Sequence, residues 1–287
     1  EAFEIGQLTN YVFDTTTVIN GSISGSLNIK PNAAPLLIDG DLFIAAIEYN
    51  KIPLGNAMVI FQNQGVETSA IIELSDQFTN VYADVALKKN NEIEGNLDIQ
   101  ELDVKAIEPF LDNLISDAKG NVKGSLKIDG TLNEPELIGT LELKDISAKV
   151  TSLGSAYTIQ NGNLDFSDNL LKTNITFLDE LNRTALLKGS IQHNSYKDFQ
   201  FNLNLSTEAF TFLDSEPQPQ LPFYGKLNAV LDADITGNIE RPEIFAVFAT
   251  EENTDITIAS LGNKSKLTNE SYVIFVDGKD YNDNQLD

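Results

Sequence analysis

The sequence contains no cysteine and no tryptophan, and it has only one histidine and one methionine. Without cysteine the chain has neither a disulfide framework nor thiolate chemistry. The one histidine, His193, lies in the polar segment SIQHNSYKD, where we expect it at the surface. This leaves little basis for a Ser-His-Asp triad or a His-rich metal site, so we expect no enzyme activity, no cofactor and no metal. A pair of carboxylates of the glycosidase kind stays open as an alternative, because the chain has 43 acidic residues.

Positive charge is scarce as well. The chain has 19 Lys and Arg residues, and its formal net charge is −24. Such a charge repels nucleic-acid phosphates and anionic headgroups at long range, so no nucleic-acid partner is expected. No run of 18 apolar residues occurs, and the N-terminal EAFEIGQLTNYVF has no basic flank that would mark a signal sequence. Because the chain starts in mid-pattern without methionine, we expect a fragment of a longer protein, with any membrane anchor outside it.

What the sequence does have is alternation of apolar and polar residues. In SISGSLNI, one face of a strand collects Ile23, Gly25, Leu27 and Ile29, and the serines take the other. The same period recurs in VYADVALKK, EIEGNLDIQ, NVKGSLKID, ELIGTLELK, ALLKGSIQ, FQFNLNLS, KLNAVLDADITG and TDITIA. Strands with one apolar and one polar face predict a mostly β protein with an antiparallel sheet. The dipeptides Asp39-Gly40, Asn161-Gly162 and Asp277-Gly278 predict turns of a meander.

Helical patterns are few. The clearest covers residues 102–120, where apolar residues share one helical face, with Pro109 in the first turn and Gly120 at the end. Weaker patterns occur in FEIGQLTNYVFD near the N-terminus and in STEAFTFLDSE near residue 210. We therefore expect short helices between groups of strands.

A longer period of about 100 residues lies above the strand period. Pro35 and Pro135 follow similar glycine-rich strands, and Pro242 follows a third, diverged copy. We predict an elongated array of repeats. Its parts are repeat unit one at 1–101, repeat unit two at 102–211, a proline-rich connector at 212–225, a partial third unit at 226–276, and a tail or linker at 277–287.

The order of these segments resembles a known family. The segments GNVKGSLKIDGTLNEPELIGTLELKDISAKV and YTIQNGNLDFSDNLLKTNITFLD are similar to the repeating unit of the TamB family, the inner-membrane subunit of the translocation and assembly module. The segments FYGKLNAVLDADITGNIERPEIFAVFATEENTDITI and ESYVIFVDGKD resemble the part just upstream of that family's C-terminal domain, in its Bacteroidota type. On this resemblance neither the N-terminal anchor nor the C-terminal domain is in the chain.

The resemblance implies a β-taco, a long antiparallel sheet curled into a trough with an apolar inside. It also implies a periplasmic protein anchored in the inner membrane, which conducts phospholipid to the outer membrane and aids outer-membrane protein assembly. The implied partners are phospholipid acyl chains, an outer-membrane barrel of the TamA type bound through the absent C-terminal domain, and the inner membrane bound through the absent anchor. The wider AsmA-like group of bridge-like lipid transfer proteins shares this plan.

The glycines fit such a trough. Gly25, Gly95, Gly124, Gly139 and Gly189 all fall in phase with the apolar residues. On a concave face side chains crowd, and glycine permits strong twist and close backbone approach. The predicted groove lining is Ile23, Leu27, Ile29, Ile38, Leu42, Ile44, Val81, Val85, Leu87, Ile93, Leu97, Ile99, Val122, Leu126, Ile128, Leu137, Leu141, Leu143, Leu164, Phe166, Leu171, Ile175, Phe177, Leu187, Ile191, Phe199, Phe201, Leu203, Leu205, Leu227, Leu231 and Ile235.

Two alternatives stay open from the sequence. Strands that have one apolar face, with glycines on that face, also build a two-sheet sandwich, in which the apolar faces of the two sheets pack together. In function, the alternative to a lipid path is a scaffold that receives outer-membrane protein strands at exposed sheet edges by β-augmentation.

Overall fold

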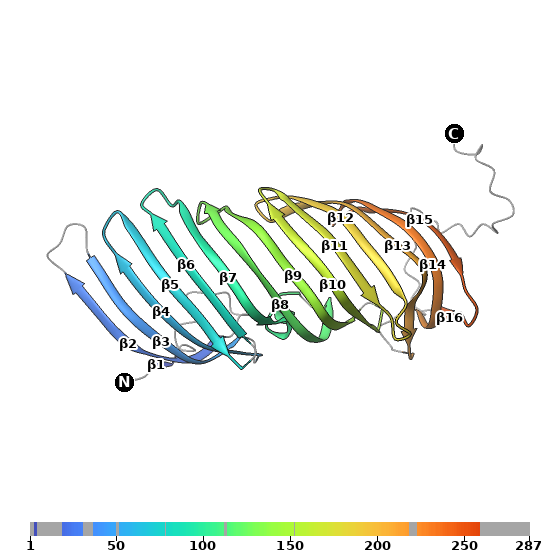
Figure 1. Ribbon diagram of the computed structural model, residues 1–287, viewed down its shortest axis with the longest axis horizontal. Coiled ribbons are helices and arrows are strands. Elements are labelled where there is room, and N and C mark those ends of the chain that lie inside the picture. Colours follow the sequence, from blue (N-terminus) through green and yellow to red (C-terminus); the bar gives the residue numbers. More distant parts are fainter. Residues whose placement is uncertain are drawn as a thin grey trace, which may run out of the picture.

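The computed structural model describes residues 3–4, 19–30, 37–49, 52–77, 79–111, 114–151, 153–217 and 223–258. These residues form one long antiparallel sheet, whose strands lie side by side along the long axis of the molecule (Figure 1). The prediction of a mostly β protein is confirmed. The predicted helix near the N-terminus and the turn at Asp277-Gly278 fall largely or wholly outside the described residues.

The strands follow the chain in order across the sheet. They are β1 (Phe3–Glu4), β2 (Ile19–Lys30), β3 (Leu37–Tyr49), β4 (Ile52–Asn63), β5 (Glu67–Asp76), β6 (Thr79–Lys88), β7 (Ile93–Asp103), β8 (Ile115–Gly130), β9 (Pro135–Val150), β10 (Ser155–Ser167), β11 (Leu170–Leu178), β12 (Thr184–Asn194), β13 (Lys197–Ser215), β14 (Phe223–Asn238), β15 (Pro242–Thr250) and β16 (Asp255–Ile258). Two 3₁₀ turns, η1 (Val104–Ala106) and η2 (Glu108–Leu111), lie between β7 and β8.

The sheet is open. Each strand from β1 to β14 pairs with the next, and β15 and β16 pair with different parts of β14. Among the described strands the first and the last do not pair with each other, and no second sheet covers the first. The fold is therefore a single curled sheet of the β-taco kind, and the sandwich alternative is wrong.

The two faces of the sheet differ sharply in burial. We call the face that carries Val122, Leu143 and Ile175 the inner face, and the opposite one the outer face. Buried apolar side chains of the strands gather on the inner face: Ala57, Ala83, Ile99, Val122, Leu126, Leu143, Ile146, Ile175, Ala185, Phe210, Leu213, Ala229 and Ala233. Curvature shields this face, because strands bent around a common axis bring their inward side chains together.

Glycines on the inner face permit the close approach of neighbouring strands. A Cβ atom at Gly25, Gly95, Gly124, Gly139 or Gly189 would overlap a backbone carbonyl oxygen of a neighbouring strand, well inside the 3.0 Å that real Cβ atoms keep. At Gly124 and Gly139 the φ angles of +148° and +147° add a backbone conformation that other residues rarely adopt. The prediction that these glycines allow the sheet to curl is thus supported by their geometry.

The predicted helix at 102–120 is wrong. The segment forms η1 and η2, and then enters β8 at Ile115, which pairs with Val150 of β9. Strand pairing therefore outweighs the local helical spacing. The predicted helix near residue 210 is also wrong, because that segment is the end of β13. Two bulges in β13 place Phe210 and Leu213 on one face, and this spacing of three imitates a helix.

Two of the predicted turns are wrong as well. Asp39-Gly40 lies within β3 and Asn161-Gly162 lies within β10. In the first, Gly40 stands opposite Leu27 on the inner face. Both dipeptides therefore lie within strands and do not reverse the chain, and Gly40 also approaches the backbone of β2 closely.

The repeat units stay a prediction. Pro135 and Pro242 each start a strand opposite a glycine of positive φ, Gly130 and Gly237, which gives the two positions a similar local geometry. The first residues of the predicted connector at 212–225 belong to β13 and its last residues belong to β14, whereas 218–222 lie outside the described residues.

Candidate functional site

The inner face carries an unbroken apolar row along the sheet. The pairing of successive strands places one residue of every strand from β2 to β15 in this row, and each is apolar or glycine. The apolar row consists of Gly25, Leu42, Val59, Ile72, Ala83, Leu97, Leu126, Gly139, Phe166, Leu171, Ile191, Phe201, Gly237 and Pro242. Because neighbouring strands lie about 4.8 Å apart, the row is roughly 60 Å long.

A second row runs beside the first with a single polar member. It consists of Ile23, Ile44, Ala57, Leu74, Val81, Ile99, Gly124, Leu141, Leu164, Thr173, Gly189, Leu203, Ile235 and Ile244. All the predicted lining residues lie on the inner face, in these two rows or in phase with them. Their contact with lipid stays a prediction.

The sequence reasoning missed the lining of β4, β5 and β15. Val59, Phe61 and Ile72 lie on the inner face, but they belong to the runs MVIFQ and SAIIELS, where the outer face is apolar too and alternation disappears. The same holds for Ile244 and Phe248 in PEIFAVFAT. A continuous apolar run of strand length was the signal that could have found them.

Exposure along the inner face is lowest in the middle and highest at the ends. Leu126 is 4% exposed, whereas Leu27 on β2 and Ile244 on β15 are 58% and 64% exposed. In the described part of the chain no large side chain is less than 2% exposed. The inner face is thus a shallow apolar groove that is open at both ends of the described sheet.

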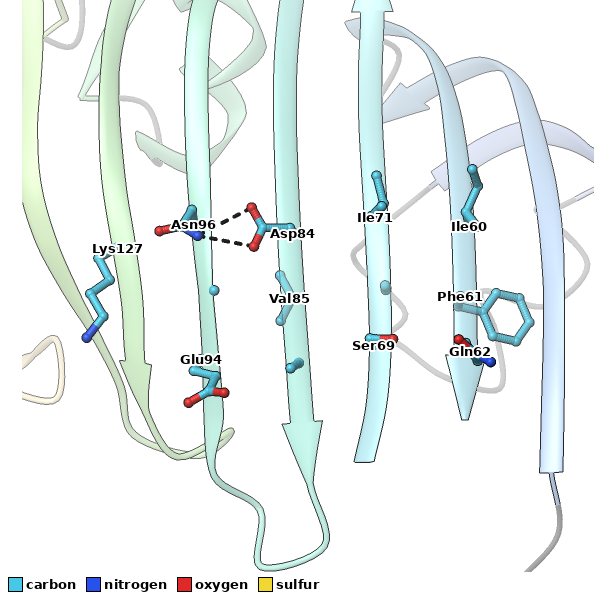
Figure 2. Close-up of a pocket in the computed structure, with 13 residues that line it drawn as sticks. Ile60, Phe61, Gln62, Ser69, Ile71, Asp84, Val85, Glu94, Asn96 and Lys127 are labelled. Atoms are coloured by element: carbon cyan, nitrogen blue, oxygen red, sulfur yellow. Dashed lines mark hydrogen bonds between the residues drawn. The ribbon is translucent and has the colours of Figure 1, made fainter. Parts of the chain in front are cut away.

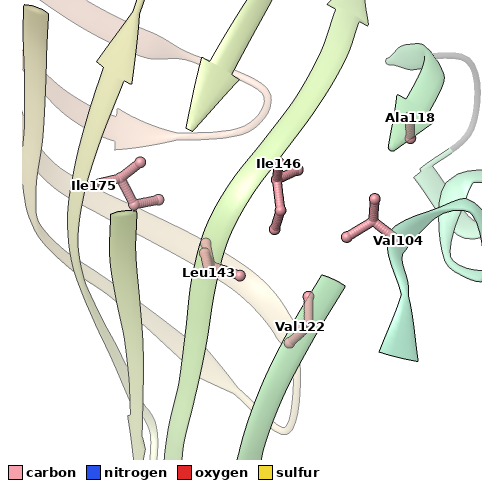
Figure 3. Packing of buried hydrophobic residues seen from close by; sticks show 6 residues of the cluster. All are labelled: Val104, Ala118, Val122, Leu143, Ile146 and Ile175. Carbon is pink, nitrogen blue, oxygen red and sulfur yellow. The ribbon is translucent and has the colours of Figure 1, made fainter. Parts of the chain in front are cut away.

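The tightest packing in the groove lies around β8 and β9. Val104 of η1 and Ala118, Val122, Leu143, Ile146 and Ile175 form the buried cluster in Figure 3. The Ala118 N–H donates a hydrogen bond of 3.0 Å to Glu108 Oε2 of η2. The two 3₁₀ turns therefore fold against one end of these strands and close that side of the groove.

A second closure joins β10 to β13, although β11 and β12 lie between them in the sheet. The Tyr157 hydroxyl donates a hydrogen bond of 2.5 Å to the Phe212 carbonyl oxygen, and the Tyr157 ring stacks on Phe210 at 5.8 Å. Nearby, the Asp214 N–H donates to Ser155 Oγ at 2.8 Å. These contacts draw the two strands together beyond the end of the β11–β12 hairpin.

Replacing Tyr157 with phenylalanine should remove the hydroxyl but keep the ring. We expect a loss of about 1 kcal/mol in the free energy of unfolding at neutral pH, because the Phe212 carbonyl loses its donor. Burial raises the pKa of Tyr157 from 10.0 to about 12, so the folded protein retains this proton more tightly than the unfolded chain. This contribution is complete below the unfolded pKa and is lost as the pH rises towards 12. Urea unfolding of both proteins across this range should show a steeper decline for the wild type, and parallel declines would contradict the assignment.

The β12–β13 turn makes a third contact across the sheet. The Leu137 N–H of β9 donates a hydrogen bond of 3.0 Å to the Tyr196 hydroxyl, and the Tyr196 ring stacks on His193 at 4.4 Å. His193 is only 7% exposed, so the expected surface histidine is wrong. Its polar neighbours form a turn that folds back over the β10–β11 turn, and burial lowers the pKa of His193.

A buried polar cluster joins the β11–β12 turn to the last strands. Asp179 accepts hydrogen bonds from Arg183 Nε at 2.7 Å and from the Thr211 N–H at 3.0 Å. The Arg183 guanidinium also donates to Thr211 Oγ1, to Asn228 Oδ1 at 2.8 Å and to Glu251 Oε2 at 3.3 Å. One arginine therefore ties the β11–β12 turn to β13, to β14 and to the segment between β15 and β16.

The described residues hold no group of three or more His, Asp and Glu side chains that could bind a metal ion. Within the same residues, no helix has the length and the hydropathy to cross a bilayer. The acidic segment at 277–287 lies outside the described residues.

An open, curled antiparallel sheet with a continuous apolar inner face defines a groove-forming β protein. Two family models match the chain, described as TamB, N-terminal domain, at residues 47–143 and as TamB C-terminal domain at residues 173–286. Together they match more than half of the chain, so the chain belongs to the TamB family, as the resemblance predicted. Neither a curated protein nor a solved structure matches the chain.

One part of the resemblance needs correction. We expected a fragment wholly upstream of the family's C-terminal domain, but residues 173–286 match the model of that domain. The degenerate strand pattern continues across this boundary, which is why the sequence motif could not locate it. Membership of the family supports a general role in outer-membrane assembly or lipid transport, and the family is not a known enzyme family.

Proposed function

We propose that this protein conducts phospholipid between the inner and outer membranes, with acyl chains in the groove and headgroups at its rim. The apolar row is the observation that carries this proposal, because it offers apolar contact at every strand from β2 to β15. An acyl chain that left a bilayer for water would lose about 0.8 kcal/mol per methylene. A continuous apolar groove removes that cost at each step, so the lipid meets no large barrier along the path.

The proposal includes the place and the partners of the protein. It acts in the periplasm without chemical catalysis, joined to the inner membrane through a segment outside this chain. At the other membrane it works with a barrel of the TamA type. Family membership supports outer-membrane assembly in general, while the cargo and the partner are our inference.

A matched pair of variants tests the lipid path. Leu27→Asp with Ile72→Asp places charge on the inner face at side chains that are 58% and 37% exposed. Ile60→Asp with Ile71→Asp does the same on the outer face at side chains that are 51% and 39% exposed. Because burial and residue types are so similar, the two variants should unfold at similar denaturant concentrations and differ in the face alone.

The measurement is mass spectrometry of the organic extract of each protein, purified without detergent. We expect phospholipid with the wild type and the outer-face variant, and at least a tenfold smaller amount with the inner-face variant. Equal lipid in both variants, or no lipid in any protein, would contradict the proposal. Lipid-free protein would favour the scaffold function, for which β15 is the supporting feature, because all its residues are exposed.

A further inference from the structure

The outer face carries a compact apolar patch at β3, β4 and β5. Phe43 of β3 pairs with Met58 of β4, and Ile60 of β4 pairs with Ile71 of β5. We call a row of residues that pair from strand to strand across the sheet a rung, so the four side chains lie on two adjacent rungs. Phe43 is 40% exposed, Met58 38%, Ile60 51% and Ile71 39%. We call these four residues the outer patch.

The outer patch interrupts a face that is otherwise polar along the same rung. From β7 to β15 the residues that continue the Phe43–Met58 rung are Asp98, Ser125, Thr140, Asp165, Lys172, Ser190, Asn202, Thr236 and Glu243. Strands that are apolar on both faces are typical of sheets covered on both faces. At β4 the inner face lines the groove, and the outer face has no cover among the described residues.

Carboxylates surround the patch at close range. Asp41 stands opposite Ile60, Glu73 opposite Met58, and Asp84 opposite Ile71. Side chains directly opposite each other have Cβ atoms about 4.5–5.5 Å apart. None of the three carboxylates forms a salt bridge with another described residue.

A hollow of about 500 Å³ continues from the patch towards β8. Figure 2 shows Ile60 and Ile71 on neighbouring strands and Asp84 beyond them, where Asn96 Nδ2 donates to its carboxylate at 3.1 and 3.4 Å. The hollow therefore has apolar side chains at one end, the carboxylates of Asp84 and Glu94 along it, and Lys127, which is paired with Asp129, at the other end.

We propose that the outer patch and this hollow form a docking surface for a basic amphipathic segment of a partner protein. Apolar side chains of the segment rest on Phe43, Met58, Ile60 and Ile71, and its Lys or Arg side chains reach Asp41, Glu73 and Asp84. The charge pattern selects this occupant: a net charge of −24 and an acidic rim repel both an anionic lipid surface and a second copy of this chain. The surface is separate from the groove, because it lies on the other face of the sheet.

The test uses a fluorescent ten-residue peptide of alternating leucine and lysine, and a counterpart of leucine and glutamate. Fluorescence anisotropy at physiological salt should show binding of the lysine peptide alone. Ile60→Ser with Ile71→Ser should weaken it at least tenfold, and so should Glu73→Gln with Asp84→Asn. Asp165→Asn, an outer-face carboxylate remote from the patch, should leave it unchanged. Circular dichroism confirms that each variant is folded.

Several results would overturn the proposal. Binding that survives both patch variants would be non-specific attraction to an acidic protein. Loss in the inner-face variant Leu27→Asp with Ile72→Asp would place the peptide in the groove. Self-association, or binding to phosphatidylethanolamine vesicles, that disappears in Ile60→Ser with Ile71→Ser would make a second copy or a lipid surface the occupant.

Discussion

Replacing Asp179 with alanine is expected to lower the free energy of unfolding by about 3–5 kcal/mol, because it leaves a half-buried arginine without its carboxylate. The Asp179 side chain is 2% exposed, and the Arg183 guanidinium that it holds is 25% exposed. Without the carboxylate, the Thr211 N–H loses its acceptor as well. Urea unfolding followed by circular dichroism would measure the loss, and β13 to β16 should be the strands that open first in hydrogen exchange.

The loss of stability at acid pH gives a second test of the role of the Asp179 carboxylate. Burial by itself would raise the pKa of Asp179, but hydrogen bonds from the Arg183 and Thr211 N–H groups and from the Arg183 guanidinium outweigh it, and the net shift is downward. A lowered folded pKa stabilises the protein above the unfolded pKa of about 3.9, and this contribution is lost as the pH falls through the folded value. The alanine variant should therefore lose less stability on acidification than the wild type.

An exposed ion pair provides the control. Lys127 and Asp129 are 2.6 Å apart, but their side chains are 56% and 46% exposed. Asp129→Ala should leave the unfolding midpoint unchanged within error, because solvent screens such pairs. If both alanine variants gave the same small effect, the Asp179 cluster would not hold the last strands together.

The inner face of the groove could be predicted from the sequence because alternation fixes which side chains share a face. Leu97, Leu126 and Phe166 were placed correctly without any knowledge of pairing, since a strand of period two leaves no other choice. Prediction failed where the same local sequence pattern fits two different structures. MVIFQ hides its alternation because both faces are apolar, and bulges in β13 produce a spacing of three that imitates a helix.

Contacts across the groove could not be predicted at all. The hydrogen bond from Tyr157 to Phe212 joins residues 55 positions apart, on strands that are not neighbours in the sheet. Whether they meet depends on how strongly the sheet curls, and curling is a sum of small twists over several strands. The burial of His193 has the same origin, since its turn folds back across β10 and β11.

Gly139→Ala tests whether that curl depends on the glycines. Gly139 lies in the apolar row between Leu126 and Phe166, and a Cβ atom there would overlap the Ser125 carbonyl oxygen of β8. A backbone oxygen in a paired strand cannot move aside as a side chain can, and the φ angle of +147° adds strain to any residue with a Cβ. We expect a loss of about 2–5 kcal/mol from steric overlap and backbone strain together.

Gly162→Ala is the matched comparison on the neighbouring strand. Gly162 also lies on the inner face, but its φ is not in the left-handed region, and the nearest atom to its Cβ would be Ile175 Cγ1, at 2.8 Å. A side-chain atom can shift, so the loss should be clearly smaller than at Gly139. Equal losses at the two positions would mean that inner-face glycines merely leave room for side chains. A larger loss at Gly139, with smaller lipid content per folded protein, would show that close backbone approach shapes the groove itself.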